Sequence, residues 1–205
     1  MTIDHVGAIL YPEHTVLRVI GRFSFPLFCY LIVLGVESTR SVRNYFARLL
    51  LFAPISQVPY YLALGYRPLD SLNIFFTLAS GVLFIHFLRK NPLLALLPAF
   101  ASFVLNFDYG LYGIALIGCM YLLKQDTNMG IVSVILLNLL FLQMWETQIF
   151  SLFALPIILF HKSGYLRVQK EVNRKTVYPA WRKYLFYIYY PLHLAVLYLI
   201  KSSSF

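Results

Sequence analysis

The sequence predicts an all-α fold, a polytopic integral membrane helix bundle of about eight transmembrane helices preceded by a short N-terminal helical stub. The first observation is composition: 60% of the 205 residues are hydrophobic and only 12% are charged, against roughly 25% charged in a soluble domain. The second is a mean hydropathy of +0.72. The third is that the basic residues fall in the gaps between apolar runs. We therefore expect residues 1–205 to form a single transmembrane domain.

Apolar runs define the expected helices in chain order. Pro92–Leu105 has 14 residues, about 21 Å of helix, against a hydrocarbon core of about 30 Å. Such short runs predict a compact bundle with an indented surface. After a stub at Met1–Tyr11, the runs are Phe23–Gly35, Leu49–Leu64, Leu72–Leu88, Pro92–Leu105, Leu111–Leu123, Gly130–Met144, Ile149–Phe160 and Tyr184–Ile200.

Loop charge gives the expected orientation. Most of the 17 basic residues fall in alternate gaps, which by the positive-inside rule are cytoplasmic. This pattern predicts a multi-pass protein of the inner (cytoplasmic) membrane, and it assigns the net charge of +9 to topology and lipid headgroups, with no nucleic-acid partner. The extracytoplasmic segments are then Tyr11–Arg22, Gly65–Ser71, Asn106–Tyr109 and Trp145–Gln148. The cytoplasmic basic residues are Arg40, Arg43, Arg48, Arg89, Lys90, Lys124, Lys162, Arg167, Lys170, Arg174, Lys175, Arg182 and Lys183.

The adjacent pair Asp4 and His5 lies in the apolar N-terminal stub. A charge at the bilayer centre costs roughly 2.5–3.5 kcal/mol, so such residues face a protein interior or carry chemistry. Neighbours on a helix point about 100° apart, so we expect one side chain to face substrate and the other to fix a neighbouring helix. An imidazole here can take a proton or an acyl group. The alternative is a buried ion pair with Arg18 or Arg22.

Four further polar residues are candidates for the same site. Arg22 is either the counter-ion of the N-terminal carboxylate or a ligand for phosphate or carboxylate. Asn73 lies near the extracytoplasmic entrance, although interhelical hydrogen bonding explains it better. Asp108 lies in a tight extracytoplasmic turn, and His193 lies in the last apolar run with Tyr189 one turn before it. No metal-ligand spacing, P-loop or GxSxG motif occurs, so no metal is expected.

Short pieces spread along the chain together resemble the TraX family, named for the conjugal-transfer protein that N-acetylates F pilin. Family members usually have about ten more apolar residues before the Asp-His pair, enough for a full first span. Either the start lies upstream or the first helix is short. The matching pieces are Met1–Gly7, Ile20–Phe28, Tyr45–Arg48, Ile55–Pro59, Asn73–Leu78, Asp108–Gly110 and Tyr190–Leu194.

The resemblance implies a transmembrane acyltransferase that uses acetyl-CoA as donor and an extracytoplasmic amine or hydroxyl as acceptor, such as a pilin N-terminus or a glycan. By the same resemblance His5 is the base or acyl carrier, oriented by Asp4 and Arg22. The surrounding substrate pocket is Asn73, Asp108 and His193, and the residues that receive the CoA phosphates are Arg40, Arg43 and Arg48.

The other class of function left open is a non-catalytic integral membrane subunit of a larger assembly. Expected partners are membrane lipid and a protein or glycan acceptor, and the oligomeric state is left open. A transporter is disfavoured because the sequence has no inverted repeat.

Overall fold

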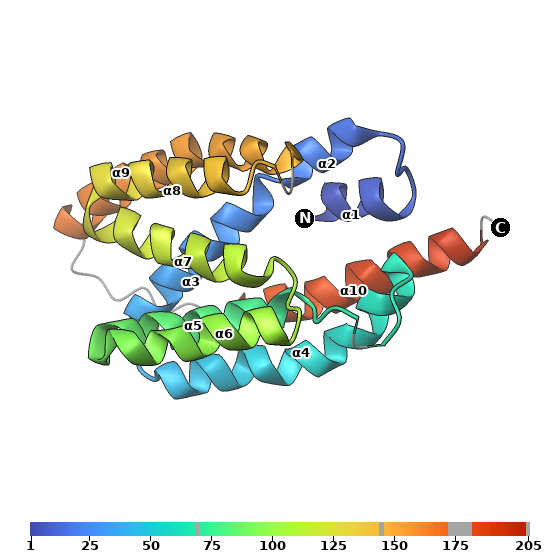
Figure 1. The fold of residues 1–205 in the computed structure, drawn as a ribbon, viewed down its shortest axis with the longest axis horizontal. Helices are drawn as coiled ribbons and strands as arrows, with labels where there is room; N and C mark the ends of the chain where they lie inside the picture. The colour runs from blue at the N-terminus through green and yellow to red at the C-terminus, as the bar shows by residue number, and fades with distance from the viewer. Residues whose placement is uncertain (69, 144–145, 172–181, 204–205) are drawn as a thin grey trace.

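The computed structural model describes residues 1–205 except 69, 144–145, 172–181 and 204–205, and the described part is helical throughout (Figure 1). A single parallel bridge between Leu72 and Phe107 is the only β-type pairing among these residues. The elements are α1 Thr2–Ile9, α2 Thr15–Gly21, α3 Ser24–Ser38, α4 Val42–Leu64, α5 Ile74–Lys90, η1 Pro92–Ala95, α6 Leu96–Val104, α7 Gly110–Gln125, α8 Thr127–Leu140, η2 Glu146–Phe153, α9 Ala154–Glu171 and α10 Arg182–Ser203.

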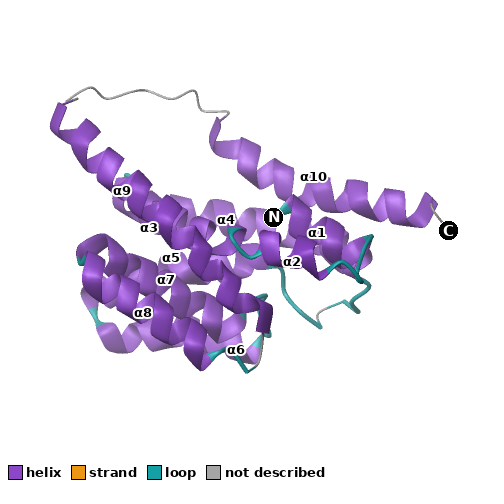
Figure 2. Ribbon diagram, turned by 90° about the horizontal axis from the view of Figure 1, so that it is seen from above, coloured by secondary structure: helices purple, strands orange, loops and turns teal. Residues whose placement is uncertain are grey.

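Helices α3, α5 and α7 pack against one another in the middle of the bundle. Helices α4 and α10 pair on one side of it, and α8 packs against α7 on the other. The short helices α1 and α2 form a hairpin that rests on α10 and α4 near one end of the molecule (Figures 1 and 2). The first and last helices of the chain therefore contact each other.

Local sequence signals set several helix ends. The Ser41 side chain accepts from the backbone of Asn44 at the start of α4, and Asp126 accepts from Met129 at the start of α8, as N-caps do. Helix α4 ends at Gly65, whose φ of 74° is the left-handed conformation that glycine adopts without strain. These caps set the start of α8 and both ends of α4.

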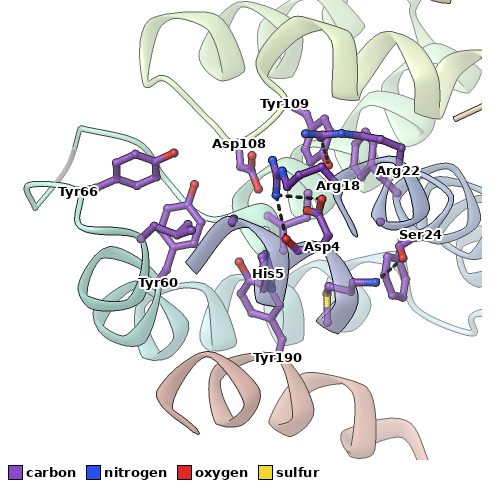
Figure 3. A pocket seen from close by; sticks show the side chains of 17 residues that line it. Asp4, His5, Arg18, Arg22, Ser24, Tyr60, Tyr66, Asp108, Tyr109 and Tyr190 are labelled. Atoms are coloured by element: carbon purple, nitrogen blue, oxygen red, sulfur yellow. Dashed lines mark hydrogen bonds and ion pairs between the residues drawn. The ribbon is translucent and has the colours of Figure 1, made fainter. Parts of the chain in front are cut away.

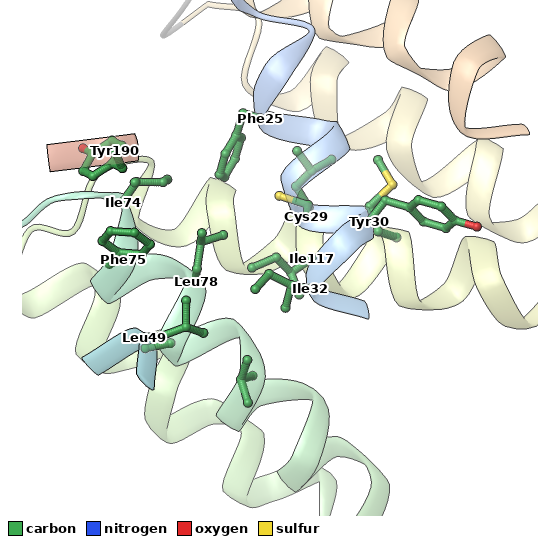
Figure 4. Packing of buried hydrophobic residues seen from close by; sticks show 14 of the residues in the cluster. Phe25, Cys29, Tyr30, Ile32, Leu49, Ile74, Phe75, Leu78, Ile117 and Tyr190 are labelled. Atoms are coloured by element: carbon green, nitrogen blue, oxygen red, sulfur yellow. The ribbon is translucent and has the colours of Figure 1, made fainter. Parts of the chain in front are cut away.

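The core lies where α3, α5 and α7 meet, and Figure 4 shows its packing. Cys29 and Val33 of α3, Leu78 of α5 and Ile117 of α7 are each at most 1% exposed. Burial of each large apolar side chain is worth about 1.5–3 kcal/mol. This core holds together the helices from which the site residues project.

Among the residues that the structure describes, two helical segments are long and apolar enough to cross a membrane, Thr15–Ser38 and Tyr184–Ser203. The expectation of about eight spans is therefore not confirmed, because helices such as α6, α7 and α8 have only 9, 16 and 14 residues. The outer faces are nonetheless apolar: Leu93, Phe100 and Leu140 are 74%, 66% and 76% exposed. An apolar outer surface of this kind suits contact with lipid.

Two predicted loops contain helix. The Tyr11–Arg22 segment, predicted as a loop from its charges, contains α2, because its arginines are held by partners in the bundle. The long polar segment after Phe160 continues α9 as far as Glu171. Trp145 and the predicted basic residues Arg174 and Lys175 lie outside the described residues.

Candidate functional site

A cavity of about 290 Å³ opens beside the α1–α2 hairpin (Figure 3). Its walls come from α1, α2, α3, α4, α10 and the turn before α7, so segments from both ends of the chain build it. Its polar lining is Asp4, His5, Arg18, Arg22, Ser24, Tyr60, Tyr66, Asp108, Tyr109 and Tyr190.

Asp4 and Arg18 join the two helices of the hairpin. Arg18 Nη1 lies 2.9 Å from Asp4 Oδ1 and donates to the Asp4 carbonyl oxygen at 3.1 Å. The helices approach so closely that a methyl group on Gly21 would overlap Asp4. The carboxylate thus fixes a neighbouring helix, and Arg18, rather than Arg22, is its counter-ion.

Arg22 has a different partner. Its Nη1 donates to the Tyr109 hydroxyl at 3.1 Å. The Tyr109 ring stacks on Phe25 with a centroid separation of 3.8 Å and an interplanar angle of 11°, and Tyr109 has a φ of 62°. Since a non-glycine residue is rarely left-handed, this turn is held in place by the stack and by Arg22.

His5 is joined to His193, on the last helix. His5 Nδ1 lies 2.7 Å from His193 Nε2, and His193 Nδ1 lies 2.9 Å from the Tyr189 carbonyl oxygen. A carbonyl only accepts, so His193 carries its proton on Nδ1 and accepts at Nε2. His5 must then donate from Nδ1, which leaves the lone pair on its Nε2.

His5 is therefore a neutral imidazole with a basic nitrogen that has no hydrogen-bond partner among the described residues. Burial, together with the nearby His193, lowers the pKa of His5 to about 3. A hydrogen bond at one nitrogen that fixes the tautomer is the geometry that general bases use, whereas the lowered pKa makes His5 a weak base until the nucleophile's proton becomes acidic in the reaction.

Asp108 is held by backbone contacts in the turn before α7. Its N–H donates to the Leu72 carbonyl at 2.7 Å, and its carbonyl accepts from the Thr77 hydroxyl. Burial raises the pKa of Asp108 to about 7, the nearby charge of Asp4 adds to the rise, and Arg22 opposes it. The side chain faces the cavity that Asp4 and Arg18 also face (Figure 3).

Asn73 lies outside the cavity lining, in contrast to the prediction. It is fully buried at the start of α5, where its side-chain oxygen accepts from Phe75 N at 3.0 Å. Its amide nitrogen donates to the Ala53 carbonyl and to Gln57 Oε1, each at 2.7 Å. With its amide engaged at both ends, Asn73 is a helix cap and an interhelical link.

The structure does not bring the three predicted phosphate ligands to the cavity. Arg40 and Arg43 are exposed where α4 begins, and Arg43 is about 25 Å along that helix from Tyr60 at 1.5 Å per residue. Arg48 stacks over the Tyr45 ring at 5.7 Å and hydrogen-bonds Tyr187.

The sequence did not single out the aromatic lining. Tyr60, Tyr66, Tyr109 and Tyr190 all face the cavity, yet each occurs in or beside an apolar run where aromatic residues are common for packing alone. Only the position of Tyr109 between Asp108 and a glycine offered a signal, since both neighbours favour a turn.

Fold and site together define a helical, membrane-associated protein with a polar cavity beside its N-terminal hairpin. The family model described as TraX protein matches residues 1–201, and the chain belongs to that family.

One similar protein is the Probable fimbrial assembly protein FimC, serogroup H1, of Dichelobacter nodosus. It is 25% identical over 218 residues, which span 96% of this chain and 89% of the relative. An uncharacterised protein of Rickettsia prowazekii (strain Madrid E) is 30% identical over 91 residues, 44% of this chain and 34% of the relative. No solved structure matches the chain.

Proposed function

We propose that the protein is a multi-pass inner-membrane acyltransferase that moves an acetyl or other short acyl group from acetyl-CoA to an extracytoplasmic amine or hydroxyl. The observation that carries the proposal is the lone pair on His5 Nε2, fixed by the hydrogen bonds from His5 to His193 and on to the Tyr189 carbonyl, in a residue that lines the cavity. Acyl transfer needs such a base beside the attacking nucleophile.

In this reaction His5 Nε2 takes the proton of the nucleophile as it attacks the thioester carbonyl. Burial raises the pKa of Tyr109, so its hydroxyl keeps its proton while accepting from Arg22. That hydroxyl lines the same cavity and can donate to the oxygen on which negative charge develops. The base, His5, comes from α1, and the hydrogen-bond donor, Tyr109, comes from the turn before α7.

Acetyl-CoA, the acyl donor, must be bound at two places, one for its acyl end and one for its phosphates. A cavity of about 290 Å³ has room for the acyl end of acetyl-CoA and not for its nucleotide, and the phosphates require cations. We propose Arg40, Arg43 and Arg48 for the phosphates, since these basic residues lie at the predicted cytoplasmic end of α4. The cavity at the other end of α4 would then receive the acyl group.

The membrane arrangement belongs to the same proposal. About eight spanning segments, with the basic gaps inside, would place the cavity near the outer leaflet. Reporter fusions test this directly: a fusion at residue 41 reports a cytoplasmic position and one at residue 66 an extracytoplasmic position if the topology is right.

The name of the Dichelobacter relative, a fimbrial assembly protein, favours a pilus or fimbrial subunit, or a glycan attached to one, as acceptor. The family resemblance favours acetylation of a pilin N-terminus during conjugation or pilus assembly. The second candidate is a non-catalytic membrane subunit of a pilus assembly, which the same relative's name also fits.

The acyltransferase must bind acetyl-CoA and transfer its acetyl group, whereas a non-catalytic subunit does neither. We would reconstitute the full chain in nanodiscs and follow transfer of labelled acetyl from acetyl-CoA to triglycine amide, with His86→Ala as the control, because His86 lies in α5 and does not line the cavity. The proposal predicts transfer by the native and His86→Ala proteins. Absence of both acetyl-CoA binding and transfer would support the subunit instead.

A further inference from the structure

Asp108 is a carboxylate without a cationic partner among the described residues. The two cavity arginines are bonded elsewhere, Arg18 to Asp4 and Arg22 to Tyr109. The Asp108 side chain accepts a hydrogen bond from the backbone of Tyr109. A partly buried carboxylate left unpaired in a cavity is costly, and it is therefore a candidate to receive a positive charge from a ligand.

The Asp108 carboxylate is the feature of the cavity that attracts a cation, although Arg18, Arg22 and the Met1 amino group line the same cavity. Its backbone is held by Leu72 and Thr77, and the bond from the backbone of Tyr109 holds its carboxylate. Tyr60 and Tyr109 line the same cavity, and aromatic rings attract ammonium groups. Around the same cavity, the titratable and charged groups from α1, α2, α4, α10 and the turn that carries Asp108 are the Met1 amino group, Asp4, His5, Arg18, Arg22, Tyr60, Tyr109 and Tyr190.

We propose that Asp108 binds an acceptor that enters the cavity as an ammonium ion and takes its first proton, while His5 takes the second as the new bond forms. Binding of the ammonium ion by Asp108 stands by itself, whereas the transfer of the second proton to His5 rests on the proposed function. It assigns two separate proton acceptors to one cavity, a carboxylate on the turn before α7 and an imidazole on α1.

The protons and electrons balance as follows. The ammonium nitrogen gives one proton to the Asp108 carboxylate and becomes a neutral amine. Its lone pair attacks the thioester carbonyl carbon, the C–N bond forms, and the second proton passes to His5 Nε2. The C–S bond breaks with its electron pair on sulfur, which takes that proton and leaves as a thiol. Asp108 returns its proton to water at the cavity mouth.

Acidity explains why two groups are needed. Burial raises the pKa of Asp108 toward that of an α-ammonium group, about 8, so this carboxylate can take the ammonium proton at little cost. Burial lowers the pKa of His5, so its imidazole is a much weaker acceptor for the same proton. The imidazole is suited to the later proton, which becomes more acidic as the carbonyl carbon bonds to nitrogen.

The first test is binding, which needs no turnover. We would compare triglycine amide with glycolyl-diglycine amide, in which a hydroxyl replaces the amine, on the full chain in nanodiscs at pH 7.5. The native protein should prefer the amine by about tenfold or more, and Asp108→Asn should lose that preference. The control is Asp70→Asn. Asp70 is an exposed loop residue whose carboxylate accepts from Arg67 N, and this variant should keep the preference for the amine. A native protein without preference, or an Asp108→Asn protein that retains it, overturns the proposal.

The second test is transfer from acetyl-CoA to the same two probes. Asp108→Asn should slow acetylation of the amine about 100-fold at pH 7 and much less at pH 9, where the amine is already neutral. Acetylation of the hydroxyl probe should change by less than about threefold. Equal losses on both probes would contradict the division between Asp108 and His5. Amine preference in binding without any transfer would support Asp108 as the ammonium site and contradict the acyltransferase reaction.

Discussion

His5 Nδ1 lies 2.7 Å from His193 Nε2, so residues from the first and last helices of the chain form one hydrogen-bonded unit. Because His193 is itself held by the Tyr189 carbonyl, the unit has one consistent set of proton positions. The basic nitrogen of His5 is therefore set by a residue on α10.

The first prediction concerns that positioning. His193→Ala removes the acceptor that fixes the His5 tautomer, and we expect the rate of acetyl transfer to fall about 10-fold to 100-fold. Tyr189→Phe is the control, because the bond to His193 uses the Tyr189 backbone and the substitution removes only the hydroxyl that contacts Thr2. Equal losses in the two variants would indicate a general disturbance of α10.

The second prediction concerns the ion pair in the hairpin. Asp4→Asn leaves the Arg18 guanidinium half-buried beside a neutral amide, and it should lower stability by about 1–3 kcal/mol, less than a fully buried pair because the arginine is 29% exposed. Thermal unfolding in detergent measures the loss. Glu13→Gln, which disturbs only an exposed contact with His14, should change stability little. A stable Asp4→Asn protein would show that the pair does not hold the hairpin.

The third prediction concerns helix approach. Gly21→Ala places a methyl group into Asp4 and its backbone, so α1 must move away from α2. We expect a loss of about 1–3 kcal/mol and a clear loss of acetyl transfer, since His5 moves with α1. Gly164→Ala is the matched control, because a methyl group there meets nothing within 4 Å, and it should be neutral or slightly stabilising.

The fourth prediction concerns pH. The pKa of Asp108 rises from 3.8 to about 7 on folding, so its protonated form is favoured in the folded state. The stability this contributes is complete below about pH 4 and is lost as pH rises through 7. Asp108→Asn should match the native protein near pH 4 and be more stable at pH 8 by up to about 4 kcal/mol, at about 1.4 kcal/mol per pKa unit. Unfolding midpoints of the two proteins at pH 4 and pH 8 measure this difference in stability. The same difference at both pH values would contradict the raised pKa of Asp108.

The sequence predicts those site residues that conflict with their surroundings. Asp4, His5 and His193 stand out because ionisable groups are rare in apolar helices, and all three lie at or beside the cavity. Asn73 shows the limit of that logic. An asparagine at the start of a helix caps it equally well, and only the contacts made by its amide distinguish the two roles.

Other features depend on tertiary contacts that local sequence does not carry. The link between His5 and His193 joins positions 188 residues apart, and neither local pattern indicates the other. The segment that forms α2 is predicted as a loop because it carries two arginines. In the structure these arginines have partners in Asp4 and Tyr109. Helical character could be predicted from the apolar runs, whereas the number of spans could not, because several runs are shorter than a bilayer core.

Chemical rescue tests the central claim, that His5 Nε2 is the base of an acyl-transfer reaction, most directly. Acetyl transfer to triglycine amide would be measured with His5→Ala in nanodiscs, with and without added imidazole. The account predicts a loss of about 100-fold or more and partial recovery when imidazole enters the space that the side chain leaves. A His5→Ala protein that transfers acetyl groups at the native rate would contradict it.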